Sequence, residues 1–142
     1  IADKSEIEKD KQKKQSTDIH GYESILIAED NEQVRKLASK VLKNQGYEVV
    51  TAENGREAVS ILDQAQKDFE LLLTDVVMPE MSGKDLYNQA VKKHPNLKVM
   101  YMSGYTGDVI DYHGITGDKK NFIQKPFSVL KLATQVREVL DK

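Results

Sequence analysis

The chain has 142 residues, of which 39% are hydrophobic and 31% charged, and its formal net charge is −2. This length suits one domain with a buried core, and the absence of cysteine excludes disulfide frameworks, thiolate zinc sites and cysteine nucleophiles. No apolar run approaches the roughly 20 residues that cross a bilayer. The balance of 21 basic and 23 acidic residues argues against a nucleic-acid-binding protein, and the lack of a secretory signal favours a cytoplasmic one.

The start of the chain differs from the rest. Its first 20 residues hold five acidic residues, five lysines and no Phe, Tyr or Trp. Such a segment cannot bury enough apolar surface to offset the entropy lost on ordering it. We therefore expect residues 1–22 to be a polar charged linker and residues 23–142 to be the folded domain. Without an initiator Met, the linker suggests a piece cut from a longer protein.

Five short apolar runs are typical of buried strands in a parallel sheet. They occupy residues 24–29, 47–52, 70–75, 97–103 and 121–124. Between them, apolar residues recur three and four positions apart, as on one face of a helix. We expect one helix between an Asn31 cap and a Gly46 stop, one capped by Asn54 in a capping box with Glu57, and one from a Ser82 cap through His94.

The last third of the chain continues this alternation. The glycine-rich segment 104–117 can hold at most a short helix, and Pro126 suits the first turn of a last helix that buries Val129, Leu132 and Val136. Five strands alternating with five helices predict an α/β fold, a doubly wound parallel sheet with helices on both faces.

Polar side chains stand where the predicted strands end. Glu29 and Asp30 end the first, Asp75 the third, Ser103 the fourth and Lys125 the fifth. Because the carboxyl ends of parallel strands share one edge of the sheet, these residues should meet in one pocket. Three neighbouring carboxylates repel one another and so favour a divalent cation. Oxygen ligands without cysteine favour Mg²⁺ over zinc.

Four separated motifs, ILIAEDN, LLLTDVVMPEMSG, YMSGYTG and FIQKPFS, stand in order at these strand ends. In them the chain resembles the receiver domains of response regulators in two-component signalling, over about residues 23–141. The resemblance implies a flavodoxin-like (βα)5 fold with a five-stranded parallel sheet of order 2-1-3-4-5.

The resemblance assigns roles to the acidic residues. Asp75 matches the phosphoacceptor, Asp30 the acid that binds Mg²⁺ directly, and Glu29 the acid that holds it through water. Val77 matches the residue whose backbone carbonyl completes the metal site, so its side chain is free to vary.

The remaining site residues are assigned in the same way. Ser103 matches the hydroxyl residue that senses the phosphoryl group, and Lys125 the lysine that pairs with a phosphate oxygen. Phe122 matches the switch aromatic, where Tyr is common, so a hydroxyl-dependent contact is lost. Gly104 and Tyr105 flank the pocket as its rim.

The family also implies partners. The phosphoryl donor would be a phosphohistidine of a histidine kinase or of a histidine phosphotransfer domain. Among receivers, the phrases MSGYTGD and FIQKPFS resemble those at the C-terminus of hybrid sensor histidine kinases, whose parent protein is a transferase and can be membrane-anchored. Phosphorylation would alter the face formed by the fourth helix, the fifth strand and the fifth helix, a candidate homodimer interface. We expect this domain itself to contact neither nucleic acid nor membrane.

Alternatives from other classes remain. A stand-alone single-domain response regulator would have the same motifs. A haloacid-dehalogenase-like phosphatase also uses an Asp nucleophile, but that family places an acid two residues after it, where Val77 stands here. A flavodoxin-like FMN carrier would need a phosphate-cradling loop after the first strand, and the acidic run from Glu29 to Asn31 would repel phosphate. A scaffold that no longer signals is opposed by the complete set of site residues.

Overall fold

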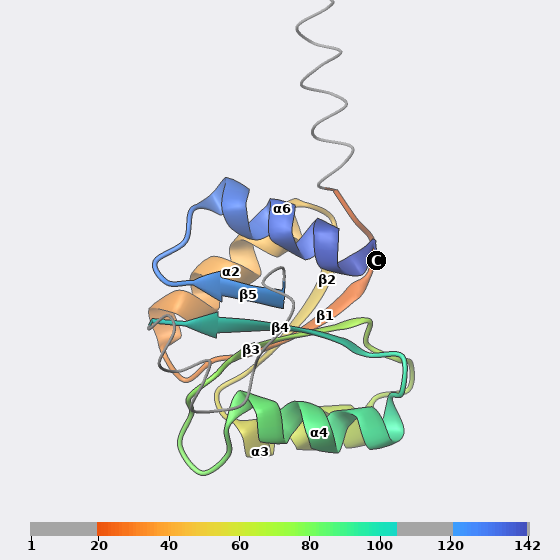
Figure 1. The fold of residues 1–142 in the computed structure, drawn as a ribbon. Helices are drawn as coiled ribbons and strands as arrows, with labels where there is room; N and C mark the ends of the chain where they lie inside the picture. The colour runs from red at the N-terminus through yellow and green to blue at the C-terminus, as the bar shows by residue number, and fades with distance from the viewer. Residues whose placement is uncertain (1–19, 105–120, 142) are drawn as a thin grey trace, which may run out of the picture.

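The computed structural model describes residues 20–104 and 121–141, which form a five-stranded parallel sheet between two layers of helices (Figure 1). The strand order is β2-β1-β3-β4-β5, and every pairing is parallel. This confirms the predicted doubly wound flavodoxin-like fold with order 2-1-3-4-5. The elements are β1 Ser24–Ala28, α2 Glu32–Asn44, β2 Glu48–Ala52, α3 Gly55–Gln64, β3 Leu71–Asp75, α4 Gly83–Lys93, β4 Lys98–Ser103, β5 Phe122–Gln124 and α6 Val129–Leu140.

The sheet divides the core into two clusters. Helices α2 and α6 cover one face and α3 and α4 the other (Figure 1). Because side chains alternate along a strand, Ile25 and Ile27 of β1 pack under α2 and α6, whereas Leu26 and Ala28 pack under α3 and α4. Both faces of β1 and β3 are therefore buried, which explains why these strands are continuous apolar runs rather than alternating ones.

Three of the predicted helix caps are present. The side chains of Asn31, Asn54 and Ser82 accept hydrogen bonds from backbone N–H groups in the first turns of α2, α3 and α4, at 3.0, 2.8 and 3.1 Å. The capping box differs in one detail, since Glu57 accepts from the N–H of Glu53 rather than from that of Asn54. Gly46 follows the C-cap of α2 and has a φ of 104°, a conformation that favours glycine.

The sequence predicted Pro126 in the first turn of the last helix. This prediction is wrong, because Pro126 precedes that helix. Helix α6 begins at Val129, and the Ser128 side chain caps it by accepting from the N–H of Lys131 at 3.0 Å. A serine side chain satisfies a free N–H group at a helix start, which a proline ring cannot do, so Ser128 sets the boundary. The short helix expected in 104–117 lies outside the described residues, apart from Gly104.

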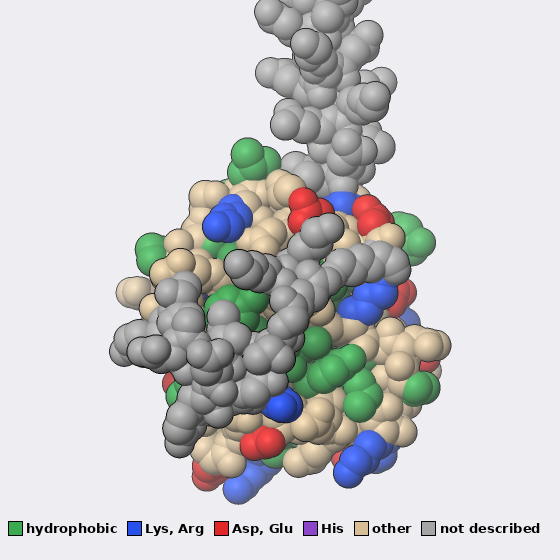
Figure 2. Space-filling view, in the orientation of Figure 1, with side chains coloured by type: hydrophobic (Ala, Val, Ile, Leu, Met, Phe, Trp, Pro, Cys, Tyr) green, Lys and Arg blue, Asp and Glu red, His purple; other side chains and the backbone are tan. Residues whose placement is uncertain are grey.

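Charged side chains are spread over the surface. On the face seen in Figure 2, the Lys and Arg side chains of the described residues are interspersed with Asp and Glu. Within the described ranges, no helix is both long and apolar enough to span a membrane.

Candidate functional site

The structure places the predicted polar residues together at the carboxyl edge of the sheet. Asp75 and Ser103 are the last residues of β3 and β4, Glu29 and Asp30 follow β1, and Lys125 follows β5. Glu29, Asp30 and Asp75 each offer a carboxylate oxygen, and these oxygens all lie within 4.8 Å of one another. The order of the strands produces this cluster, because β1 and β3 are adjacent at the centre of the sheet.

Lys125 bridges two of the three acids. Its Nζ lies 2.6 Å from Glu29 Oε1 and 3.2 Å from Asp75 Oδ2, and only 18% of its side chain is exposed. Burial is the largest influence on this ammonium and lowers its pKa, but the hydrogen bonds and charges of Glu29 and Asp75 outweigh it, so the pKa of Lys125 is raised. Lys125 therefore stays charged beside the acids.

Glu29 is buried and held at all of its polar atoms. Its N–H donates to Ala52 O at 3.1 Å, which continues the pairing of β1 with β2. Its Oε1 accepts from Lys125, its Oε2 accepts from the N–H of Asn31 at 3.1 Å, and its backbone carbonyl accepts from Arg35 at 2.9 Å. A carboxylate with both oxygens occupied and no exposed surface is poorly placed to approach a ligand directly.

Asp30 is the exposed acid of the cluster. Partial burial and, after it, the hydrogen bond and charge of the neighbouring Glu29 raise the pKa of Asp30 above its ordinary value. A hollow of about 540 Å³ adjoins it, lined by Asp30, Glu32, Arg35, Glu53, Asn54, Pro79 and Glu80. The cluster therefore has an accessible carboxylate and a negatively lined approach, which suit a cation.

The loop after β3 fixes the position of Asp75. The N–H of Val77 donates to Asp75 Oδ1 at 3.4 Å, and the N–H of Gly83 donates to Val76 O at 2.9 Å. A Cβ at Gly83 would lie 2.2 Å from the Asp75 carbonyl oxygen, so only glycine lets α4 begin this close to the strand. The sequence predicted no such role for Gly83. The side chain of Val77 is 52% exposed.

Ser103 and Phe122 occupy the neighbouring strands β4 and β5. Ser103 is buried, and its carbonyl accepts from the N–H of Lys125 at 2.7 Å, which ties the end of β4 to the lysine. Phe122 is half-buried, opens β5 opposite Tyr101 and packs against the core under α3 and α4. Among the described residues, a Cβ on Gly104, which the sequence predicts at the rim, would meet no heavy atom within 4 Å.

The geometry places the described site residues but tests none of the roles predicted for them. Tyr105, predicted at the pocket rim, lies outside the described residues. The backbone carbonyl of Val77 stays a predicted metal ligand.

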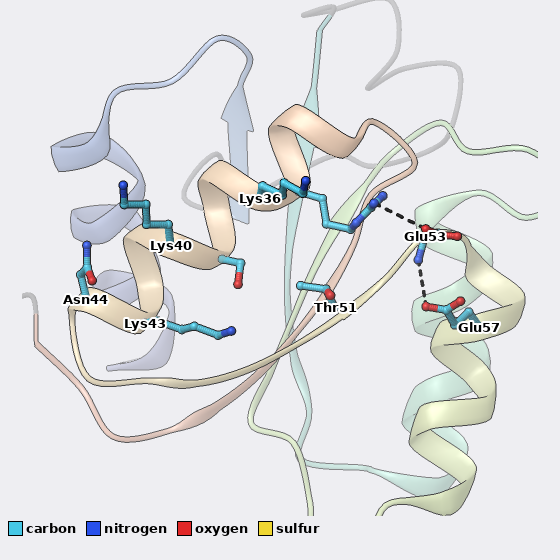
Figure 3. A pocket seen from close by; sticks show the side chains of 9 residues that line it. Lys36, Lys40, Lys43, Asn44, Thr51, Glu53 and Glu57 are labelled. Carbon is cyan, nitrogen blue, oxygen red and sulfur yellow. Dashed lines mark hydrogen bonds and ion pairs between the residues drawn. The ribbon is translucent and has the colours of Figure 1, made fainter.

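Another hollow, of about 630 Å³, lies between α2 and the edge strand β2 (Figure 3). Lys36, Lys40 and Lys43 of α2 border it beside Thr51 of β2. Lys36 and Lys40 are exposed, and Lys36 already pairs with Glu32 at 3.0 Å. We place the functional site at the acid cluster instead, because its charges converge and two of its three acids are buried, whereas these lysines stand along a solvated helix face.

The family model described as "Response regulator receiver domain" matches residues 25–137. Among curated proteins, a "Sensor kinase CckA" of Brucella abortus (strain 2308) is 37% identical over 134 residues, which are 94% of this chain but 14% of that kinase. A "Response regulator receiver protein CpdR" of the same strain is 34% identical over 116 residues, 82% of this chain and 95% of that protein.

Solved structures give the same fold. The receiver domain of a hybrid histidine kinase CckA aligns with a TM-score of 0.68 and 32% identity, over 82% of this chain and 98% of that one. The chemotaxis response regulator CheY4 of Vibrio cholerae aligns with a TM-score of 0.70 and 26% identity, over 84% of this chain and 99% of that one.

Proposed function

This chain belongs to the response regulator receiver family, and from that premise we propose that it is the phosphoacceptor of a two-component phosphorelay, with Asp75 as the residue that takes the phosphoryl group. One observation carries the proposal: Asp75 ends a central strand within 3.2 Å of the Lys125 ammonium and within a cluster of three carboxylates. Nucleophile, charge partner and metal-ligand candidates thus meet at one point.

The oxygen donors of the cluster fit Mg²⁺. Asp30, as the exposed acid, would bind the ion directly, with Asp75 and the Val77 carbonyl as further ligands, and Glu29, whose oxygens are already engaged, would hold it through water. Carboxylates without a histidine or cysteine ligand favour a hard cation over zinc. When bound, Mg²⁺ supplies positive charge that neutralises the oxygens of the phosphoryl group.

Phosphoryl transfer depends mostly on positioning and electrostatics. A carboxylate oxygen of Asp75 attacks the phosphorus of a phosphohistidine in line with the bond to the imidazole nitrogen. The new O–P bond forms as the P–N bond breaks, and the imidazole nitrogen keeps the electron pair. Lys125, which pairs with Asp75 and Glu29 before the reaction, turns one of its donors to a phosphoryl oxygen.

The switch follows from the neighbours of Asp75. The hydroxyl of Ser103 moves toward the new dianion, and Phe122 moves into the space that Ser103 leaves. The backbone bond from Lys125 to Ser103 supports this coupling, because it connects the phosphate partner with β4. The change would be read on the face that includes β5 and α6, which is also the proposed homodimer interface.

Two parent proteins fit the comparisons. A hybrid sensor histidine kinase is supported by the sensor kinase relative, of which this chain spans 14%. A stand-alone response regulator is supported by the receiver protein relative, of which it spans 95%. In either case the partner is a phosphohistidine of a kinase or phosphotransfer domain, and the location of this domain is the cytoplasm, with any membrane anchor elsewhere in the parent.

Intact-mass spectrometry after incubation with acetyl phosphate and Mg²⁺ tests this function. We expect one phosphoryl group on the wild type and none on Asp75→Asn, because the amide keeps the shape but is not a competent nucleophile. Asp85→Asn is the matched control, since Asp85 is an exposed acid of α4 outside the cluster, and it should be phosphorylated like the wild type. Full phosphorylation of Asp75→Asn would refute the assignment.

A further inference from the structure

We infer that Arg35 is a positioning residue for the acid site: its guanidinium fixes the turn between β1 and α2, and thereby the direction in which Asp30 presents its carboxylate to the cation. The inference rests on the proposed function for its purpose, but it is measured by cation binding. Arg35 lies in the first turns of α2, five residues after Asp30, and belongs to none of the four receiver-like motifs.

The contacts of Arg35 are directed at this turn. Its Nη1 donates to the Glu29 carbonyl oxygen at 2.9 Å, and its Nη2 lies 3.6 Å from Glu53 Oε1, the ion pair drawn in Figure 3. Only 12% of the Arg35 side chain is exposed, against 67% for Glu53. Nη1 of the guanidinium thus holds the backbone at the acid site, while Nη2 pairs with Glu53 in the loop between β2 and α3.

The Glu29 carbonyl belongs to the peptide unit that joins Glu29 to Asp30. A fixed carbonyl sets the plane of that peptide, because the peptide unit is rigid, and so it sets the Cα position of Asp30. The Glu29 side chain is independently fixed by Lys125 and by the N–H of Asn31. The hydrogen bond from Arg35 therefore extends the fixed position of Glu29 to the backbone of Asp30.

Arginine suits this position because its planar fork donates in two directions at once. A lysine would bring the same charge but one compact ammonium, which cannot reach Glu29 and Glu53 with the same geometry. If position 35 held neither arginine nor lysine, the Glu29 carbonyl would lose its side-chain hydrogen bond beside a buried carboxylate. The turn could then rotate and carry the Asp30 carboxylate away from the cation site.

A merely electrostatic role predicts the opposite sign. Arg35 is a cation beside a cation site, so removing its charge alone should tighten Mg²⁺ binding. Loss of positioning should weaken it, since partners that orient metal ligands typically contribute about 10- to 100-fold in affinity. The direction of the change in the Mg²⁺ dissociation constant therefore separates the two roles.

The test is a Mg²⁺ titration followed by backbone amide NMR spectra, in which peak dispersion also reports whether each variant is folded. We expect Arg35→Met and Arg35→Lys to weaken Mg²⁺ binding about 10- to 100-fold. Lys36→Met is the matched control, because it removes the same charge from an exposed neighbour that pairs with Glu32, and binding should be unchanged or slightly tighter. Glu53→Gln removes the ion pair and keeps the bond to Glu29, so its effect should be small.

Unchanged or tighter binding in Arg35→Met would overturn the inference. If Arg35→Met proves unfolded, Arg35→Lys decides alone, and wild-type affinity in that variant overturns the inference equally. Failure of the proposed function gives a different result. The wild type would bind Mg²⁺ and the Arg35 variants would bind it more weakly, yet the wild type would take no phosphoryl group from acetyl phosphate.

Discussion

Glu29 and Asp30 are adjacent acids with opposite surroundings. Glu29 has no exposed surface, and each of its oxygens has a partner, whereas Asp30 is exposed and repelled by its neighbour. A raised carboxyl pKa means that the folded state binds the proton more tightly than the unfolded state does. At neutral pH the ionised form of Asp30 therefore opposes folding until a cation binds.

The effect of Asp30→Asn on the free energy of unfolding should change sign between metal-free conditions and Mg²⁺. In EDTA we expect the free energy of unfolding to rise by a few tenths of a kcal/mol and at most about 1 kcal/mol, because solvent screens the repulsion. In millimolar Mg²⁺ the wild type should gain stability and the variant should not. Urea titrations under both conditions measure this, with Glu138→Gln on an exposed carboxyl of α6 as the control. A variant that is less stable than the wild type in EDTA would contradict the account.

At the scale of elements, Arg137 ties α6 to the beginning of the sheet. Its Nη1 and Nη2 lie 3.0 and 2.5 Å from the two carboxylate oxygens of Glu23, just before β1. It also donates to His20 O at 3.0 Å and to Tyr47 Oη at 3.3 Å. Burial is the largest influence on Glu23 and raises its pKa, but the hydrogen bond from Arg137, two backbone N–H hydrogen bonds and the charge of Arg137 together outweigh it, so the pKa of Glu23 is lowered.

Glu23→Gln should destabilise the protein in a pH-dependent way. A carboxyl whose pKa is lowered by folding contributes stability above its unfolded value near 4.5 and loses it as the pH falls through the folded value. We expect a loss of about 1.5–3 kcal/mol at pH 7, as for other hydrogen bonds to charged groups. The loss should shrink as the pH falls from 4.5 through the lower folded value, because the unfolded carboxyl takes up its proton first and the folded carboxyl follows. Urea unfolding of the wild type and Glu23→Gln at several pH values measures this loss. A difference in the free energy of unfolding that stays constant with pH would contradict a stabilising Glu23–Arg137 ion pair.

Gly83 sets the contact between β3 and α4. Its added Cβ would lie 2.2 Å from the Asp75 carbonyl oxygen, so Gly83→Ala must shift the loop. We expect about 1–3 kcal/mol of destabilisation, the usual cost of overpacking, together with slower phosphorylation. Gly104→Ala, where an added Cβ meets no atom of the described part of the chain within 4 Å, is the control for the free energy of unfolding. Equal stability of Gly83→Ala and the wild type would show that the contact relaxes freely.

The elements and the acid cluster were predictable because local signals specify them. The central strands β1 and β3 are fully buried and mostly apolar, and Asn31, Asn54 and Ser82 mark helix starts. Parallel pairing then brings the strand ends together without further information. Pro126 misled because its ring also suits a loop, and Ser128 is the stronger start signal.

The contacts of Arg35 and Arg137 could not be predicted in this way. Arg35 reaches back to Glu29 over a turn, and Arg137 reaches Glu23, 114 residues away in the chain. Neither contact leaves a periodic pattern, because any surface-facing arginine fits the same helix positions. Only the folded arrangement shows that both side chains are mostly buried, at 12% and 13% exposure.

In the whole molecule, the acid cluster and residue 20 lie at opposite edges of the sheet. The acid cluster stands where the strands end, whereas residue 20 and the end of α6 meet at the amino edge through Arg137 (Figure 1). A segment preceding residue 20 therefore joins the domain away from Asp75. We expect this separation to leave the acid cluster open to a phosphohistidine partner.

The most direct test of the central claim is to locate the phosphoryl group. Borohydride reduces an aspartyl phosphate to homoserine: a first hydride adds at the carbonyl carbon and phosphate leaves, and a second hydride with a proton reduces the resulting aldehyde to the alcohol. After phosphorylation with acetyl phosphate and Mg²⁺, tandem mass spectrometry of the reduced protein should show homoserine at position 75 and at no other acidic residue, and EDTA should abolish it. Homoserine at another position, or an equal yield in EDTA, would contradict the assignment of Asp75 as the magnesium-dependent phosphoacceptor.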